Sequence, residues 1–232
     1  MNILKDKERE LVWYTFNHDD DYKFAYYQRR FRRYLDIVDT WGENPKVQKF
    51  LGSGKPLGHY MKGLCESIPD YKLYFATNLE GELVSALVTS TNDMLKLTLN
   101  LENHLLFGKD EKTDTEEFIT KSQIRELLDT KDDNNIYLAF NVVAPEYQGH
   151  GIGTRILSSV KNNLEYFAGC KEANLQMTVD HDNIASHKVV YKNGFRRLNP
   201  AKSTTEFSIY YLHAKSDINE QNNNQNENNL VQ

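Results

Sequence analysis

The sequence contains little cysteine, no long apolar run and no excess of positive charge. Two cysteines, Cys65 and Cys170, occur in 232 residues, which favours a reducing compartment over a disulfide-stabilised secreted fold. No apolar run approaches the roughly 20 residues of a membrane-spanning helix, and the charged start, Met1 to Glu10, lacks the apolar segment of a secretory signal. We therefore expect a cytoplasmic protein with no membrane partner.

The net charge of −5 also argues against a nucleic-acid partner, because nucleic-acid-binding surfaces are usually basic. One basic run, Arg29-Arg30-Phe31-Arg32-Arg33, lies within a predicted helix at Tyr22–Val38. It could bind RNA or an anionic acceptor, or it could be the solvated face of a helix that buries its aromatic residues. The acidic composition favours the solvated face, so we predict no nucleic acid. The histidines show no metal-ligand spacing, so we predict no metal site.

The most informative stretch is a buried strand followed by a glycine-rich turn and a helix. Residues 136–143 are nearly all apolar, which is typical of a strand covered on both faces. Pro145 ends that strand. Apolar residues then recur at helical spacing, at Ile152, Ile156, Leu157, Val160, Leu164 and Phe167. Gly149, Gly151 and Gly153 leave backbone N–H groups uncovered at the positive end of this helix, which predicts a diphosphate site.

Two common diphosphate-binding loops do not fit this turn. A Walker loop requires Lys after its last glycine, but Thr154 and Arg155 follow Gly153. The dinucleotide fingerprint is G-x-G-x-x-G, whereas these glycines are spaced G-x-G-x-G. No acidic residue closes a second parallel strand about 20 residues later, as that fingerprint also requires.

The specific pattern is Gln148-x-x-Gly151-x-Gly153 directly after a Val-x-Pro strand end. It matches every defined position of (Arg/Gln)-x-x-Gly-x-(Gly/Ala), and so resembles the pyrophosphate motif of the GNAT superfamily. Members of that superfamily are acyl-coenzyme A-dependent N-acyltransferases.

A second segment strengthens the resemblance. An alternating strand at Leu175–Val179 leads to Asn183-x-x-Ser186, which matches the family pattern Asn-x-x-(Ala/Ser), and then to Gly194-Phe195. Asp182 or Asn183 can cap a short helix here, and Gly194 can end it in the left-handed conformation.

The resemblance implies a mixed α/β (α+β) fold with a mostly antiparallel central sheet, flanking helices, and splayed fourth and fifth strands. The predicted elements follow the order that GNAT domains show. They are a strand at Leu11–Phe16, the helix described above, a short helix at Pro56–Cys65, a hairpin of Tyr71–Asn78 and Glu82–Ser90, and a closing strand at Thr204–Leu212. We predict a single domain over residues 1–215.

The main departure from the family is an insertion at about residues 91–135, where the family has a short turn. Alternating leucines from Leu95 to Leu101 predict an added strand, and Thr115–Leu128 predicts a helix. The insertion could cover the acceptor site or form a homodimer contact, and the sequence leaves both open. Residues 216–232 are dominated by Asn, Gln and Glu and are predicted to be a disordered tail.

The resemblance also implies acetyl-coenzyme A (acetyl-CoA) as cofactor. Backbone groups of Asn141, Val142 and Val143 would bind its pantetheine arm, and the Val143 N–H would polarise the thioester carbonyl. The pyrophosphate would be bound by Gln148, Gly149, His150, Gly151, Ile152, Gly153 and Thr154. Asn183 and Ser186 complete the predicted site.

Catalytic side chains are not assigned. Many GNAT members place a general-acid Tyr seven residues after the Asn, but Val190 stands there, and Tyr191 lies about 100° further around the helix. Thr178 stands where some relatives carry a Glu as general base. The favoured function is direct transfer of acetyl from acetyl-CoA to a primary amine of a small-molecule, peptide or protein acceptor in a ternary complex. The alternative is a non-catalytic acyl-CoA-binding or sensory module on the same fold.

Overall fold

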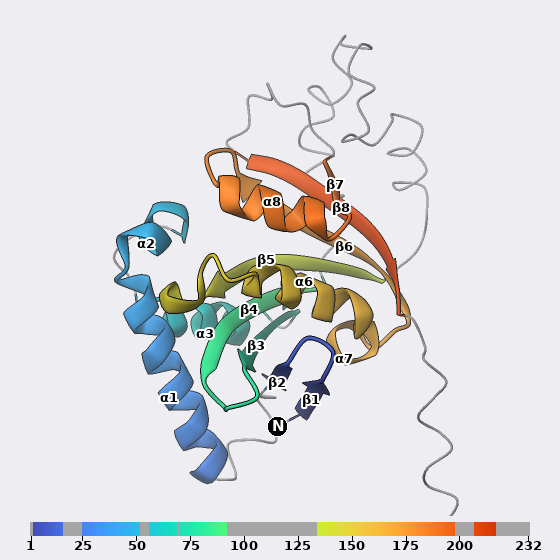
Figure 1. Cartoon of the computed structure of the whole chain (residues 1–232). Coiled ribbons are helices and arrows are strands. Elements are labelled where there is room, and N and C mark those ends of the chain that lie inside the picture. Colours follow the sequence, from blue (N-terminus) through green and yellow to red (C-terminus); the bar gives the residue numbers. More distant parts are fainter. Residues whose placement is uncertain are drawn as a thin grey trace, which may run out of the picture.

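A mixed sheet forms the centre of the computed structural model (Figure 1), which describes residues 2–15, 25–51, 56–68, 70–91, 134–197 and 207–216. The described strands are β1 (Asn2–Asp6), β2 (Leu11–Thr15), β3 (Tyr71–Thr77), β4 (Leu83–Ser90), β5 (Asn135–Val143), β6 (Glu172–Asp180), β7 (Arg196–Arg197) and β8 (Phe207–Lys215). The described helices are α1 (Ala25–Gly42), α2 (Pro45–Leu51), α3 (Leu57–Ser67), α6 (Ile152–Asn162), α7 (Leu164–Ala168) and α8 (Ile184–Lys192), with a 3₁₀ turn, η2 (Pro145–Tyr147).

The strand order is β1-β2-β3-β4-β5-β6-β8-β7. Within the described residues every neighbouring pair is antiparallel except β5 and β6, which are parallel. This confirms the predicted mixed, mostly antiparallel sheet flanked by helices. The β4–β5 register advances by two residues on β5 for one on β4, which leaves Ala139 in a bulge.

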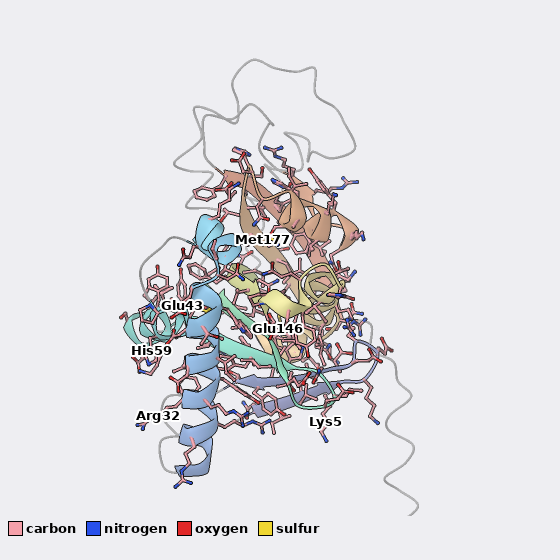
Figure 2. The ribbon with its side chains drawn as sticks, turned by 60° about the vertical axis from the view of Figure 1, so that its left-hand side comes forward. Lys5, Arg32, Glu43, His59, Glu146 and Met177 are labelled. Atoms are coloured by element: carbon pink, nitrogen blue, oxygen red, sulfur yellow. The ribbon has the colours of Figure 1, made fainter. Side chains whose placement is uncertain are left out.

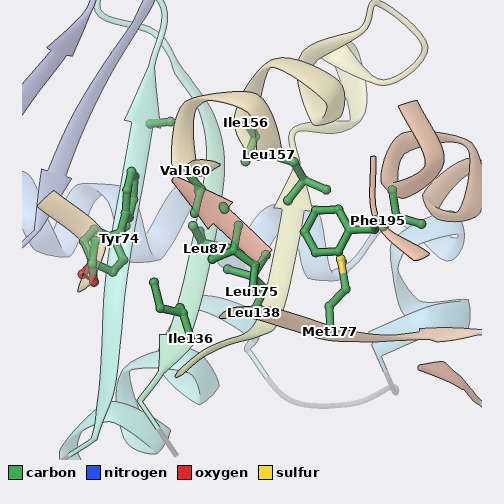
Figure 3. Packing of buried hydrophobic residues seen from close by; sticks show 14 of the residues in the cluster. Tyr74, Leu87, Ile136, Leu138, Ile156, Leu157, Val160, Leu175, Met177 and Phe195 are labelled. Atoms are coloured by element: carbon green, nitrogen blue, oxygen red, sulfur yellow. Dashed lines mark hydrogen bonds between the residues drawn. The ribbon is translucent and has the colours of Figure 1, made fainter. Parts of the chain in front are cut away.

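Helices cover both faces of the sheet, and each face has its own apolar cluster. In Figure 1, α6, α7 and α8 lie in front of the sheet, and their buried side chains pack with those of the strands behind them. Figure 3 shows this packing, with the Met177 sulfur directed at the ring of Phe195. On the other face α1, α2 and α3 contribute Tyr34, Leu35, Val38, Trp41, Val47, Leu57 and Met61.

The exposed side of α1 carries most of the basic run that the sequence analysis singled out. Arg29, Arg32 and Arg33 are exposed, and Figure 2 shows Arg32 pointing away from the sheet. Arg30 instead lies over the ring of Tyr14, 4.1 Å from its centroid. The observed exposure agrees with a solvated helix face.

The N-terminal hairpin, β1–β2, is tied to α6 by a buried carboxylate. Asp6 is 6% exposed and accepts hydrogen bonds from Ser159 Oγ at 2.6 Å and Asn163 Nδ2 at 3.1 Å. Trp13 Nε1 donates to Ser159 Oγ at 2.8 Å. At the exposed rim an ion pair joins Arg155 of α6 to a carboxylate of the hairpin turn. The position of α6 therefore depends on residues about 150 positions earlier in the chain.

Three local elements differ from the sequence-based expectation. β1 was not predicted, because charged residues surround its few apolar ones. Residues 45–51 were expected to be part of an irregular connection but form α2, which begins at Pro45 with proline in its favoured first position. The helix after the glycine turn is two helices, since Asn163 leaves the helical conformation and turns its side chain to the Ser159 carbonyl.

Apart from β7 and η2, which were not predicted, the other elements occur as predicted within the limits of the described residues. β2, α1, α3, β6 and α8 match the predicted strands and helices, and β3 and β4 form the predicted hairpin. β8 matches the last predicted strand and lies between β6 and the short edge strand β7. Cys65 and Cys170 are both free thiols. The strand and helix predicted in the insertion lie outside the described residues, as does the tail at 217–232. None of the helices described is both long and apolar enough to cross a membrane.

Candidate functional site

β5 and β6 are paired over only part of their length. Each strand has nine residues, but their described ladder contains only three pairs, Asn135↔Asn174, Ile136↔Leu175 and Tyr137↔Gln176. Figure 1 shows the two ribbons meeting at one end and separating toward the other. The splay itself remains a prediction, but the ladder is short enough to leave the later half of β5 unpaired on its β6 side.

Backbone groups on that half of β5 point alternately toward β4 and β6. The Ala144 N–H donates to the Val84 carbonyl of β4 at 3.0 Å. Because N–H directions alternate along a strand, those of Val143 and Asn141 point toward β6. The Val143 carbonyl also points there and accepts a hydrogen bond from Gln148 Nε2 at 3.1 Å. The predicted arm-binding residues therefore present the backbone groups that such a role needs.

The turn after β5 depends on two glycines in the left-handed conformation. Gly149 has φ 83° and Gly151 has φ 79°, values that side chains other than glycine adopt only with strain. A Cβ added at either position would meet nothing within 4 Å. The backbone of this turn therefore faces open space, as a cradle for a large anion requires.

The first turn of α6 completes this cradle. Gly151 is the N-cap residue and supplies no side-chain hydrogen bond. The N–H groups of Ile152, Gly153 and Thr154 have no acceptor among the described residues. With the helix dipole behind them, these groups can bind a pyrophosphate, so the chain fits the phosphate end of coenzyme A.

Gly153 has a different role from the two glycines before it. A Cβ at this position would lie 3.4 Å from Val189 Cγ2 and 3.9 Å from Val143 Cγ2. Its missing side chain lets α8 and the end of β5 approach the first turn of α6. Asn193 supports the same contact by donating from Nδ2 to the Thr154 carbonyl at 3.3 Å.

The second motif begins and ends α8 as predicted. Asn183 is the N-cap, and its Oδ1 accepts from the Ser186 N–H at 3.1 Å. The Asn183 amide nitrogen has no partner in the described part of the chain, so it can donate to a ligand. At the other end Gly194 has φ 84° and Phe195 is buried.

A hydrogen-bonded group of side chains that the sequence did not predict joins η2, just before the glycine turn, to the turn between β3 and β4. The Tyr147 hydroxyl of η2 donates to Glu82, and Asn78 Nδ2 donates to the same carboxylate at 2.9 Å. The hydrogen bond from Tyr147 lowers the pKa of Glu82 and raises that of Tyr147. No local pattern indicated this contact, because Glu82 reads as an ordinary exposed acid in a hairpin.

The side chains of Val190 and Tyr191 have different surroundings on α8. Val190 is fully buried in the cluster on the α6 face of the sheet. The Tyr191 ring packs edge-on against Tyr210 of β8, with centroids 5.5 Å apart. Tyr191 lies about 200° around α8 from Val189, which faces α6. It is therefore turned away from the phosphate cradle.

One group of side chains elsewhere in the described residues has metal-ligand types. Asp36, Asp39 and His59 place their ligand atoms within 4.8 Å of one another on α1 and α3. Asp39 accepts from the His59 N–H at 3.1 Å, so it caps α3, whose N-cap Pro56 makes no such bond. This group lies outside the candidate site.

A sequence profile of the acetyltransferase (GNAT) family matches residues 68–195, more than half of the chain. The chain therefore belongs to the GNAT family of acetyltransferases. No curated protein matches the sequence.

Several solved GNAT structures share the fold. One is aminoglycoside acetyltransferase AAC(6')-Ib in complex with coenzyme A, with TM-score 0.52 and 12% identity over 87% of this chain and 92% of that chain. Another is spermidine N-acetyltransferase from Vibrio cholerae with CoA and spermine, with TM-score 0.50 and 9% identity over 88% and 96%. A third, from Salmonella typhimurium, modifies the N-terminal serine of a 50S ribosomal subunit protein, with TM-score 0.50 and 11% identity over 90% and 95%.

Proposed function

We propose that this protein transfers an acetyl group from acetyl-CoA to a primary amine of a small-molecule or peptide acceptor. The observation that carries this proposal is the path of backbone N–H groups from Asn141 and Val143 to the uncapped first turn of α6. Acetyl-CoA, when bound, supplies an acetyl group that is already activated as a thioester.

The direction of the path assigns the two β5 N–H groups. The phosphates would bind at Gly149–Thr154, so the Val143 N–H lies nearer to them and the Asn141 N–H lies deeper. We therefore assign the Val143 N–H to the pantetheine arm and the Asn141 N–H to the thioester carbonyl. The donor to the thioester is then two residues earlier in β5 than Val143, the donor expected from the sequence. The pairing of this part of β5 with β4 holds the donor in place, so it can stabilise charge on the carbonyl oxygen without rearrangement.

The transfer itself needs little from side chains. The amine nitrogen bonds to the carbonyl carbon, and the C–S bond breaks. The nitrogen loses one proton, and the leaving thiolate of coenzyme A gains one. Val190 has no proton to give and Tyr191 is turned toward Tyr210, so in this proposal water carries the proton. Holding the amine and the thioester together supplies most of the rate.

The apolar Val190 also favours a second candidate, a non-catalytic acyl-CoA-binding or sensory module. A turnover screen distinguishes the two. It would measure thiol release from acetyl-CoA with polyamines, aminoglycosides, amino acids and peptides, and binding of acetyl-CoA by calorimetry. The net charge of −5 places cationic amines first in the panel.

Amine-dependent release would support the transferase. Binding without release for any acceptor would support the module, and absence of binding would contradict both.

A further inference from the structure

Two hydroxyl side chains cross from β5 to β6 directly after their ladder ends. The Tyr137 hydroxyl and Thr178 Oγ1 lie 2.9 Å apart. Tyr137 belongs to the last pair of the ladder, with Gln176, and Thr178 is two residues further along β6 on the same face as Gln176. The Tyr137 side chain therefore extends along β6 beyond the last backbone pair.

The opposite face of the sheet is filled at the same level. Leu138 and Met177, the next residue on each strand, are 3% and 8% exposed and belong to the cluster drawn in Figure 3. The inner end of the β5–β6 boundary is therefore closed by a hydroxyl pair on one face and by apolar side chains on the other. Burial raises the pKa of Tyr137, so its hydroxyl stays neutral and the pair needs no charged partner.

This closed end lies a short distance from the proposed thioester position. If the ladder's register is extended, Thr178 stands level with Ala139, two residues before Asn141. Two residues of strand span about 7 Å. An acyl group whose carbonyl meets the Asn141 N–H points away from the phosphate cradle and toward the hydroxyl pair.

We propose that Tyr137 and Thr178 form the inner wall of the acyl site and restrict the donor to short acyl groups, acetyl or propionyl. This inference rests on the proposed function, because it takes the direction of the arm from it. A wall of this kind discriminates by size. Each methylene that does not fit costs about 10–200-fold in use of the donor.

The test compares acetyl-, butyryl- and hexanoyl-CoA as donors. Dissociation constants would be measured by calorimetry, and thiol release would be measured with the best amine found. Hexanoyl carries three methylenes more than propionyl, so the parent should bind or use hexanoyl-CoA at least about 1,000-fold less well than acetyl-CoA. Tyr137→Ala should reduce this difference about tenfold or more by opening the inner end, and Tyr137→Leu, which keeps an apolar core, should act in the same direction.

Two matched variants separate the wall from general destabilisation. Tyr137→Phe keeps the ring and should leave the chain-length preference nearly unchanged. Leu164→Ala removes a buried apolar side chain of α7, outside β5 and β6, and should lower stability without admitting hexanoyl-CoA.

Equal use of acetyl- and hexanoyl-CoA by the parent would overturn the inference. So would an unchanged preference in folded Tyr137→Ala and Tyr137→Leu proteins. Either result, obtained with proteins that still bind coenzyme A, would leave the proposed function standing. If the parent does not bind coenzyme A at all, both the proposed function and this inference are rejected. If the parent binds acyl-CoA without turnover, the dissociation constants alone test the wall.

Discussion

Replacing Gly151 by Glu should abolish the binding of coenzyme A while leaving the protein folded. Gly151 is the N-cap of α6 with φ 79°, and an added Cβ would meet nothing within 4 Å. The cost to folding is therefore backbone strain of about 1–2 kcal/mol without a steric clash. The new carboxylate would instead occupy the cradle and repel a pyrophosphate from the helix N-terminus.

The expected signal follows from linkage between binding and stability. Coenzyme A at about 100 times its dissociation constant should stabilise the parent by about 2.7 kcal/mol. At about 2–4 °C per kcal/mol for a domain of this size, the melting temperature should rise by about 5–11 °C. In Gly151→Glu the rise should disappear, as measured by thermal unfolding and checked by calorimetry.

The chain offers a matched control at Gly169. This residue follows α7 with φ 73° and also has open space where a Cβ would be placed. Gly169→Glu introduces the same strain and charge away from the cradle, so it should retain the full rise. Asn tolerates the left-handed conformation and carries no charge, so Gly151→Asn should retain more of the rise in melting temperature than Gly151→Glu. A folded Gly151→Glu protein with the parent's response to coenzyme A would refute the site.

Three further predictions concern other parts of the molecule. Tyr191→Phe should keep kcat within about tenfold of the parent. Loss of a positioned general acid costs about 10²–10⁴-fold in rate. A hundredfold drop in kcat with unchanged coenzyme A affinity would therefore identify Tyr191 as the general acid. Replacing residues 92–133 by a short turn should preserve coenzyme A affinity but change acceptor preference or oligomeric state. A folded, monodisperse product without affinity would count against this. Burial lowers the pKa of His187, so the unfolded state binds its proton more readily and stability should fall as the pH drops below about 6.5. Urea unfolding at about pH 7.5 and about pH 5.5 should show this loss, and His187→Gln should diminish it.

The parts of the site that could be predicted are those in which a short segment determines its own backbone. Gly194 has the left-handed conformation that was predicted, and Gly149 and Gly151 lie in the predicted turn between β5 and α6, where their φ values are also positive. Asn183 caps α8 through a bond only three residues long. Such features depend on neighbouring residues, so the sequence displays them directly.

The parts that could not be predicted join residues that are far apart in the chain. Tyr137 and Thr178 are 41 positions apart, and Tyr147 and Glu82 are 65 apart. A tyrosine within an apolar strand signals that its hydroxyl needs a partner, but the sequence does not say which. β1 was missed for a related reason. The hydrogen bonds that satisfy its buried Asp6 come from Ser159 of α6 and from Asn163, which directly follows that helix.

The attachment of β1–β2 to α6 has a consequence for the order of events during synthesis. Asp6 and Trp13 leave the ribosome about 150 residues before Ser159, their partner. At about 5–20 residues per second this delay is about 8–30 s, during which the hairpin lacks the helix that buries it. Native contacts of this sequence separation also form slowly after release. We therefore expect the nascent chain to expose Trp13 until α6 emerges, and to need protection from aggregation during that interval.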